Sequence, residues 1–294
     1  MRYIRDQYHE QGILFVSYLH SNTFMETIGY IASFFIGVSL GLIGGGGSIL
    51  TVPVMVYLFG LNPLLATSYS LFIVGSTSLV GALNNLRRGL VSIQAALFFG
   101  AASIVTVFLT RKFLLPIIPK NIFTIGDFTV TESLLTMVLF GLLMLMAAYN
   151  MIRKRKVEPE QKELTLAIRL PKLLIYGVSI GLITGLLGAG GGFLLIPALI
   201  FLLRLPMKKA IGTSLMIIAL NSLIGFVGDI GHFSIDWFFL LKITLIAIGG
   251  IFIGGAVGKK LPGDQLKKGF GWFVLIMGIY ILVKELFLSH ATGI

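Results

Sequence analysis

The stretch that decides the fold is GLIGGGGSILTVP, from Gly41 to Pro53, because it places four consecutive glycines inside an apolar run. A second stretch, GLLGAGGGFLLIP from Gly185 to Pro197, matches it at an offset of 144 residues. The same offset relates Ser70-Leu71 to Ser214-Leu215, and three long apolar runs follow each copy. Because identity, spacing and hydropathy agree, the chain is interpreted as a tandem repeat.

The composition is that of an integral membrane protein. Of 294 residues, 56% are hydrophobic and only 12% are charged, whereas a soluble domain carries about 25% charged residues. This hydrophobicity excludes disorder, and the absence of cysteine excludes a disulfide scaffold. The net charge of +11 comes from short Lys/Arg clusters between apolar runs. Such clusters are typical of cytoplasmic loops and not of a nucleic-acid-binding face, so we expect a lipid bilayer and no nucleic acid as partner.

The apolar runs predict an all-α integral membrane fold. Six runs approach the roughly 20 residues that span a bilayer. They are 64–86, 90–109, 133–152, 210–227, 235–257 and 269–287. Two more regions, 25–59 and 173–203, are interrupted by the glycines. We therefore predict two inverted-topology repeats, each with a glycine-broken helix hairpin and three spanning helices. The predicted divisions are an N-terminal segment 1–22, a first repeat 23–152, a basic cytoplasmic linker 153–172 and a second repeat 173–294.

Loop charge predicts the orientation. With the linker in the cytoplasm, 16 Lys and Arg residues lie inside and 6 outside, the bias expected when cytoplasmic loops carry the positive charge. Arg111 and Lys112 then lie in one outer loop, and Asp229 lies in another, where a solvated turn residue is the ordinary expectation. The equivalent turns at Gly60 and Arg204 lie on opposite sides. Each glycine-broken region must therefore enter and leave the membrane on the same side. With this orientation both termini of the chain face outward.

The two glycine breaks predict a binding site for an anion. Half-helices are expected to begin at Ser48 and Phe193, and a helix start carries unpaired N–H groups and a partial positive charge. Two such starts pointing at the middle of the membrane would bind an anion without a buried cation. Secondary transporters place their sites in this way, at the interface of inverted repeats. The alternative is that glycines serve helix packing. We expect that role for Gly249, Gly250, Gly254, Gly255 and Gly258.

Polar groups inside the apolar runs extend the candidate site. Hydroxyl groups there either donate to an anion or bond back to their own helix. Lys242 is the basic residue that lies clearly inside a spanning run, where it lines a pathway or snorkels outward. The candidate substrate-binding residues are Gly44, Gly45, Gly46, Gly47, Ser48, Gly190, Gly191, Gly192, Ser70, Ser214, Asn221 and Lys242. Residues of the same cavity could include Ser76, Thr77, Ser78 and Ser222.

The sequence contains few residues suited to proton coupling, metal binding or catalysis. His232 or Asp229 could titrate in a proton-coupled transport cycle. The sequence shows no metal-ligand constellation and no nucleophile–base set, so we expect no cofactor, no metal and no enzymatic activity. A homodimer is left open.

The paired motifs resemble the TauE/SafE family of sulfite and organosulfonate membrane transporters, also called the sulfonate permease superfamily. The resemblance rests on the two glycine motifs and on an A-x-x-x-S-L element after each, at Ala66–Leu71 and Ala210–Leu215. It covers roughly residues 25–290. It implies an inner-membrane permease, usually an exporter, that carries sulfite, sulfoacetate or other sulfonates, with Gly44–Gly47 and Gly190–Gly192 as matching positions. The alternatives are a transporter of another small anion, such as a carboxylate, and an anion channel.

Overall fold

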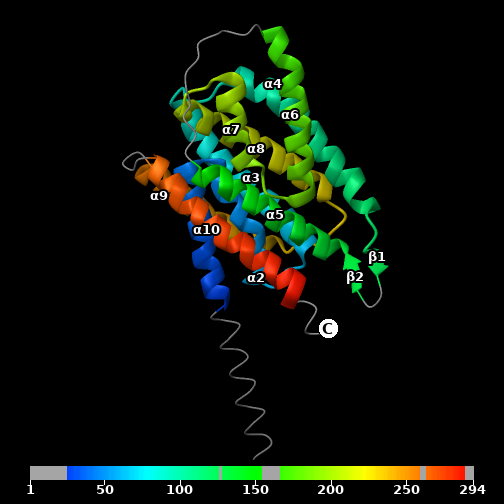
Figure 1. Cartoon of the computed structure of the whole chain (residues 1–294). Helices are drawn as coiled ribbons and strands as arrows, with labels where there is room; N and C mark the ends of the chain where they lie inside the picture. Colours follow the sequence, from blue (N-terminus) through cyan, green and yellow to red (C-terminus); the bar gives the residue numbers. More distant parts are fainter. Residues whose placement is uncertain (1–24, 126–127, 154–165, 259–262, 289–294) are drawn as a thin grey trace, which may run out of the picture.

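The chain folds into a bundle of apolar helices, shown by a computed structural model that describes residues 25–125, 128–153, 166–258 and 263–288 (Figure 1). The first helix, Met25–Ile43, is followed by a 3₁₀ turn, η1 (Gly45–Leu50), that continues into α2 (Thr51–Tyr57). The remaining helices are α3 (Pro63–Arg87), α4 (Ile93–Leu109), α5 (Glu132–Ile152), α6 (Leu166–Leu187), α7 (Gly192–Leu203), α8 (Met207–Asp229), α9 (Trp237–Val257) and α10 (Gly263–Val283). Short turns extend α4 through η2 (Thr110–Leu114) and η3 (Leu115–Ile117), and extend α10 through η4 (Lys284–Leu288).

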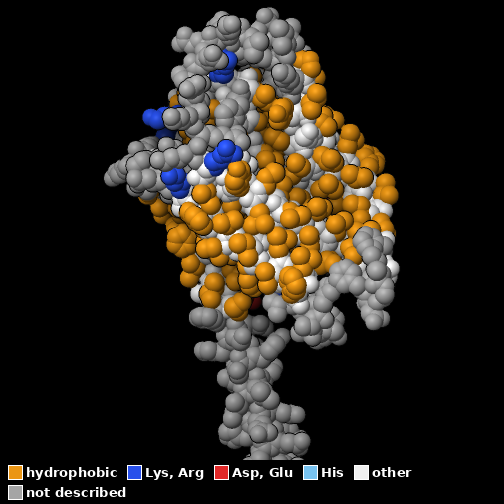
Figure 2. All heavy atoms as spheres, viewed as in Figure 1, with side chains coloured by type: hydrophobic (Ala, Val, Ile, Leu, Met, Phe, Trp, Pro, Cys, Tyr) orange, Lys and Arg blue, Asp and Glu red, His pale blue; other side chains and the backbone are white. Residues whose placement is uncertain are grey.

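Every apolar run predicted to span the membrane is a helix. Within the described ranges, seven helices are long and apolar enough to cross a bilayer. The seventh is Met25–Ile43, which the sequence assigned to a broken hairpin; at 19 residues it is roughly 28 Å long. Apolar side chains cover the middle of the face seen in Figure 2, and the visible Lys and Arg gather near one end. Phe238 is 82% exposed, as expected for a surface that lies in lipid.

Capping side chains set several helix starts. The Asn62 side chain accepts a hydrogen bond from the N–H of Leu64 at the start of α3, and Pro63 occupies the first helical position. Asp236 accepts from the N–H of Phe239 at the start of α9. Such caps satisfy N–H groups that the helix itself leaves unpaired. The turns between spanning helices are therefore short and well defined.

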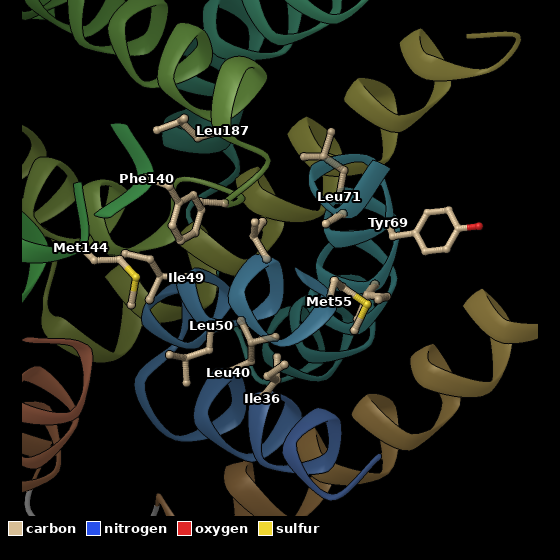
Figure 3. Close-up of a cluster of buried hydrophobic side chains, with 14 of the residues drawn as sticks. Ile36, Leu40, Ile49, Leu50, Met55, Tyr69, Leu71, Phe140, Met144 and Leu187 are labelled. Carbon is tan, nitrogen blue, oxygen red and sulfur yellow. The ribbon is translucent and has the colours of Figure 1, made fainter. Parts of the chain in front are cut away.

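The two halves make matching contacts. Helices α3 and α8 pack against each other, and α5 packs against α10. Helix α4 contacts both α6 and α8, while α9 contacts α3 and the first helix. Buried side chains from the first helix, η1, α3, α5 and α6 form one apolar cluster, in which Ile49, Leu71, Phe140 and Leu187 converge (Figure 3). Tyr69 lies at the edge of the cluster in that view, and its hydroxyl accepts a hydrogen bond from the N–H of Asp236.

Two features differ from the predicted organisation. A β-hairpin, β1 (Asn121–Ile125) and β2 (Phe128–Thr131), lies between α4 and α5, so the fold is not purely helical. Its signal was the Gly126-Asp127 dipeptide between β-branched and aromatic residues. Helix α6 begins at Leu166, inside the predicted linker. The predicted segment 1–22 and most of the linker lie outside the described residues.

Glycines of α9 confirm the packing prediction at two positions and contradict it at two. A methyl group at Gly250 would overlap the carbonyl oxygen of Phe34, and one at Gly254 would overlap that of Val38. These glycines therefore let α9 approach the first helix closely. Gly249 and Gly255 face open space. They lie one residue from the packed positions, and a helix turns by about 100° per residue, so they leave the contact face.

We predict that Gly254→Ala destabilises the protein and Gly255→Ala does not. The added methyl at Gly254 meets rigid backbone, and such overpacking costs about 1–3 kcal/mol. Thermal unfolding in detergent should show a lower midpoint for Gly254→Ala alone. Equal midpoints for the two variants would contradict the close packing of α9 on the first helix.

Candidate functional site

The two glycine breaks meet in the buried interior. Gly45, at the start of η1, and Gly192, at the start of α7, contact each other backbone to backbone, so a methyl group on either would overlap the other's Cα. Residues 44–48 and 188–192 are all buried. The half-helices begin three residues before Ser48 and one before Phe193. A difference of one or two residues from the predicted start is ordinary for a helix end. The difference of three residues at Ser48 arises because the glycines themselves form a 3₁₀ turn.

Glycine is required for the backbone path through both breaks. Gly44 has φ of 76°, and Gly188, Gly190 and Gly191 each have φ of 66°. This left-handed region is disfavoured for residues with a Cβ. The breaks are therefore fixed features of the fold and not random interruptions of two helices.

A second contact joins the breaks through a side chain. The Ser48 hydroxyl lies 2.7 Å from the carbonyl oxygen of Gly45 and 2.6 Å from that of Ala189, so its single proton is shared between the two. By the offset of 144, Gly45 matches Ala189 and Ser48 matches Gly192. The Gly45–Gly192 and Ala189–Ser48 contacts therefore involve the same two motif positions. In the first contact the earlier position comes from the first copy, and in the second contact it comes from the second copy.

Helices α3 and α8 support the breaks from behind. The Ser70 hydroxyl on α3 donates to the carbonyl oxygen of Gly188 at 2.7 Å, and a methyl at Gly188 would lie 2.5 Å from the carbonyl oxygen of Thr67. At the other break, Gly44 faces the side chain of Ile211 on α8. Thr67 and Ile211 are also related by the offset of 144.

The hydroxyl groups predicted to bind the substrate donate hydrogen bonds to backbone carbonyls in this structure. Ser214 donates to the carbonyl of Ile211, three residues earlier in its own helix, which is the ordinary alternative for a helical serine. Ser70 and Ser48 instead reach carbonyls in the second break. These two hydroxyls connect the halves of the chain, whereas Ser214 stabilises only its own helix.

Several buried polar atoms have no hydrogen-bond partner among the described residues, and one of them lies beside the second break. Asn221 donates to the Ser103 hydroxyl at 2.6 Å, while its Oδ1 has no partner among the described residues. The neighbouring Ser222 hydroxyl, also unpaired, lies beside Gly190. Thr77 and Ser78 on α3, the equivalents of Asn221 and Ser222, carry unpaired buried hydroxyls as well. Within the described ranges, no three His, Asp or Glu side chains gather as metal ligands.

Lys242 lies apart from these buried groups. It is exposed on α9, and its Nζ donates to the Tyr30 hydroxyl at 2.9 Å and lies 4.0 Å from the centre of the same ring. A lysine on an apolar helix often turns its charge to the surface in this way. The structure brings the candidate glycines, Ser48 and Ser70 together and leaves Lys242 outside that group.

An apolar groove on the bundle does not suit an anion. It has a volume of about 760 Å³ and lies between the first helix and α10, where Phe35, Leu42, Phe270 and Phe273 contribute to a nearly wholly apolar lining. An anion there would lose its hydration without gaining hydrogen bonds, at a large cost in free energy. The groove fits hydrocarbon, and the polar site lies elsewhere.

The prediction that Arg111 and Asp229 lie in solvated outer loops is wrong. Helical structure continues past Leu109 through η2, which holds Arg111, and α8 runs as far as Asp229. Both side chains are fully buried, and Arg111 Nη1 donates to Asp229 Oδ2 at 3.0 Å. Neither residue is solvated, because each neutralises the other inside the bundle.

We predict that Ser70→Ala lowers stability more than Ser179→Ala. Removing the Ser70 hydroxyl deprives the buried Gly188 carbonyl of its donor, which costs about 1–3 kcal/mol. Ser179 is an exposed helical serine that bonds only to its own helix, so its replacement should change stability by less than about 0.5 kcal/mol. Thermal unfolding in detergent measures both. Indistinguishable midpoints would contradict a supporting role for Ser70.

Apolar helices around a buried polar centre define a polytopic α-helical membrane protein. The model of the family Sulfite exporter TauE/SafE matches residues 30–281, and the chain belongs to this family. A probable membrane transporter protein of Xylella fastidiosa (strain 9a5c) is 30% identical over 254 residues, 85% of this chain and 92% of the relative.

More distant relatives carry the same description. The probable membrane transporter protein YdhB of Bacillus subtilis (strain 168) is 26% identical, over 86% of this chain and 98% of its own length. The probable membrane transporter protein MJ0441 of Methanocaldococcus jannaschii is 23% identical, over 86% and 94%. No solved structure matches the chain. The chain is accordingly a multi-pass membrane transporter.

Proposed function

We propose that this protein is a secondary transporter of small sulfur-containing anions, such as sulfite, sulfoacetate or other organosulfonates. The observation that carries the proposal is the direct contact of the two glycine breaks, Gly45 on Gly192, in the buried centre. The proposed substrate site lies at the two half-helix starts, with the buried Ser222 hydroxyl beside Gly190. Helix starts attract anions through their free N–H groups and partial positive charge.

The proposed mechanism is alternating access between two inverted repeats. Its support is that Phe59, just beyond α2, packs on Gly29 and Tyr30 near the start of the first helix, so this hairpin returns to the end where it began. In Figure 1, α2 and α7 lie towards opposite ends of the bundle. Because Gly45 and Gly192 touch, an anion can enter between them only when the two breaks separate. Opening towards one side and then the other would pass the anion through.

The chemistry of a sulfonate suits this site. It offers three acceptor oxygens and is always charged at neutral pH, which matches convergent N–H and O–H donors. An inside-negative potential contributes about 2.3 kcal/mol per charge per 100 mV to outward movement of an anion. A dianion would gain roughly twice that, a gradient of about 2,000-fold. Export therefore needs no coupling ion, and we propose export from the cytoplasm across the inner membrane.

Counterflow in proteoliposomes tests the substrate class. Vesicles preloaded with sulfite or sulfoacetate should accumulate the labelled anion, whereas acetate and succinate should compete poorly. No counterflow of any sulfur anion, or stronger competition by the carboxylates, would overturn the substrate assignment. Flux that does not saturate would favour a channel instead.

The inverted arrangement predicts opposite accessibility for equivalent turns. The chain has no native cysteine, so single cysteines at the exposed positions Asn62 and Lys208 can be labelled separately. In intact cells an impermeant maleimide should label Asn62→Cys, while Lys208→Cys should react only after permeabilisation. Labelling of both from one side would refute the inverted arrangement.

A further inference from the structure

Arg111 has a hydrogen-bonding capacity that the fold does not use. Its side chain is fully buried, and only Nη1 has a partner, the Asp229 carboxylate at 3.0 Å. Nε and Nη2 have no partner among the described residues. These two nitrogens share one edge of the planar guanidinium group, the edge whose parallel N–H bonds fit two oxygens of an oxyanion. The structure thus leaves a complete bidentate edge open.

A purely structural ion pair would not be built in this way. Burying two charges is repaid only when the geometry is good and further hydrogen bonds satisfy the remaining donors. Each buried donor that lacks a hydrogen-bond partner lowers the stability of the fold. Arg111 also lies in a π-helical turn, η2, and such turns occur often at functional sites. The open edge therefore points to a ligand with negative charge.

Residues adjacent to the ion pair contact the motif that contains the second glycine break. Thr110, the residue before Arg111, packs on Gly185, where a methyl would lie 2.7 Å from its Cβ. Ser68 on α3 lies beside the Asp229 carboxylate, and its neighbour Thr67 packs on Gly188. Both flanks of the ion pair thus contact the motif that contains the break.

The ion pair joins the two copies of the repeat, and the equivalent positions do not form a second pair. The offset of 144 relates Arg111 to Gly255 and Asp229 to Asn85. Neither equivalent carries a charge, so the repeat pattern does not require the pair. A specific role on one side of the molecule explains why each copy holds one buried charge that the other copy lacks.

We propose that Arg111 is a substrate-binding residue, whose free Nε–Nη2 edge receives two oxygens of the transported oxyanion while Asp229 holds Nη1. This inference rests on the proposed function and adds to it a cationic contact for a sulfonate or sulfite group. Two charge-assisted hydrogen bonds give the site both its attraction for the anion and its preference for a group with several oxygens. Asp229 serves as the counter-charge that keeps the guanidinium in place when no anion is bound.

The test uses two variants that separate binding from stability. In Arg111→Gln/Asp229→Asn, both charges are replaced by amides, so no buried charge is left unpaired. Arg111→Lys keeps the positive charge beside Asp229 but loses the bidentate edge. Lys112→Gln, at the adjacent exposed residue, is the matched control. The probes are sulfite and sulfoacetate, and the readouts are the KM of counterflow and the shift in thermal unfolding that each anion causes in detergent.

We expect Arg111→Lys to raise the KM roughly tenfold to a hundredfold, the loss expected when a charge-assisted hydrogen bond is removed. The double variant should fold but show neither counterflow nor anion-induced stabilisation, and Lys112→Gln should behave as wild type. Unchanged KM values in the double variant or in Arg111→Lys would mean that the pair is structural, which overturns this inference and leaves the proposed function standing. Absence of sulfur-anion transport in the wild type would overturn both.

Discussion

The contact between the Gly45 and Gly192 backbones is the constraint on which the centre of the molecule depends. Two helices end at the glycine breaks, and their continuations start where the two backbones touch and no side chain fits. Glycine in a helix costs about 1 kcal/mol relative to alanine. That cost is offset by close packing of the breaks on each other and on α3 and α8.

Much of the fold could be predicted because hydropathy and glycine placement are strong local signals. The spanning helices and the interruptions at Gly44 and Gly188 were identified correctly from the sequence. The hydrogen-bond partners that residues find across the bundle were not identified from the sequence. Ser70 and Ser214 occupy the same motif position, yet one bonds to Gly188 and the other to its own helix. That difference depends on which carbonyl is within reach in three dimensions, which a periodic pattern does not contain.

The buried ion pair was missed for a related reason. The apolar run ends at Leu109, so Arg111 was counted as a loop charge, although helical hydrogen bonding continues through it. Its partner Asp229 lies 118 residues away, and a single sequence offers no means of pairing them. The available signal was asymmetry: each of the two charged residues matches an uncharged residue in the opposite copy, Arg111 matching Gly255 and Asp229 matching Asn85. The sequence predicts an anion site without a buried cation, whereas the structure contains a buried arginine, which is paired with Asp229.

The two contacts that join the breaks have unequal chemistry, although they use the same motif positions. Gly45 and Gly192 touch through van der Waals surfaces, whereas Ser48 and Ala189 are joined by a hydrogen bond. Water can replace a hydrogen bond as it enters, but it offers no substitute for lost dispersion contact. If the breaks separate during transport, the two contacts would yield with different activation barriers. Opening towards each side would then have its own rate constant, although without a gradient of substrate the two directions of the full cycle stay balanced.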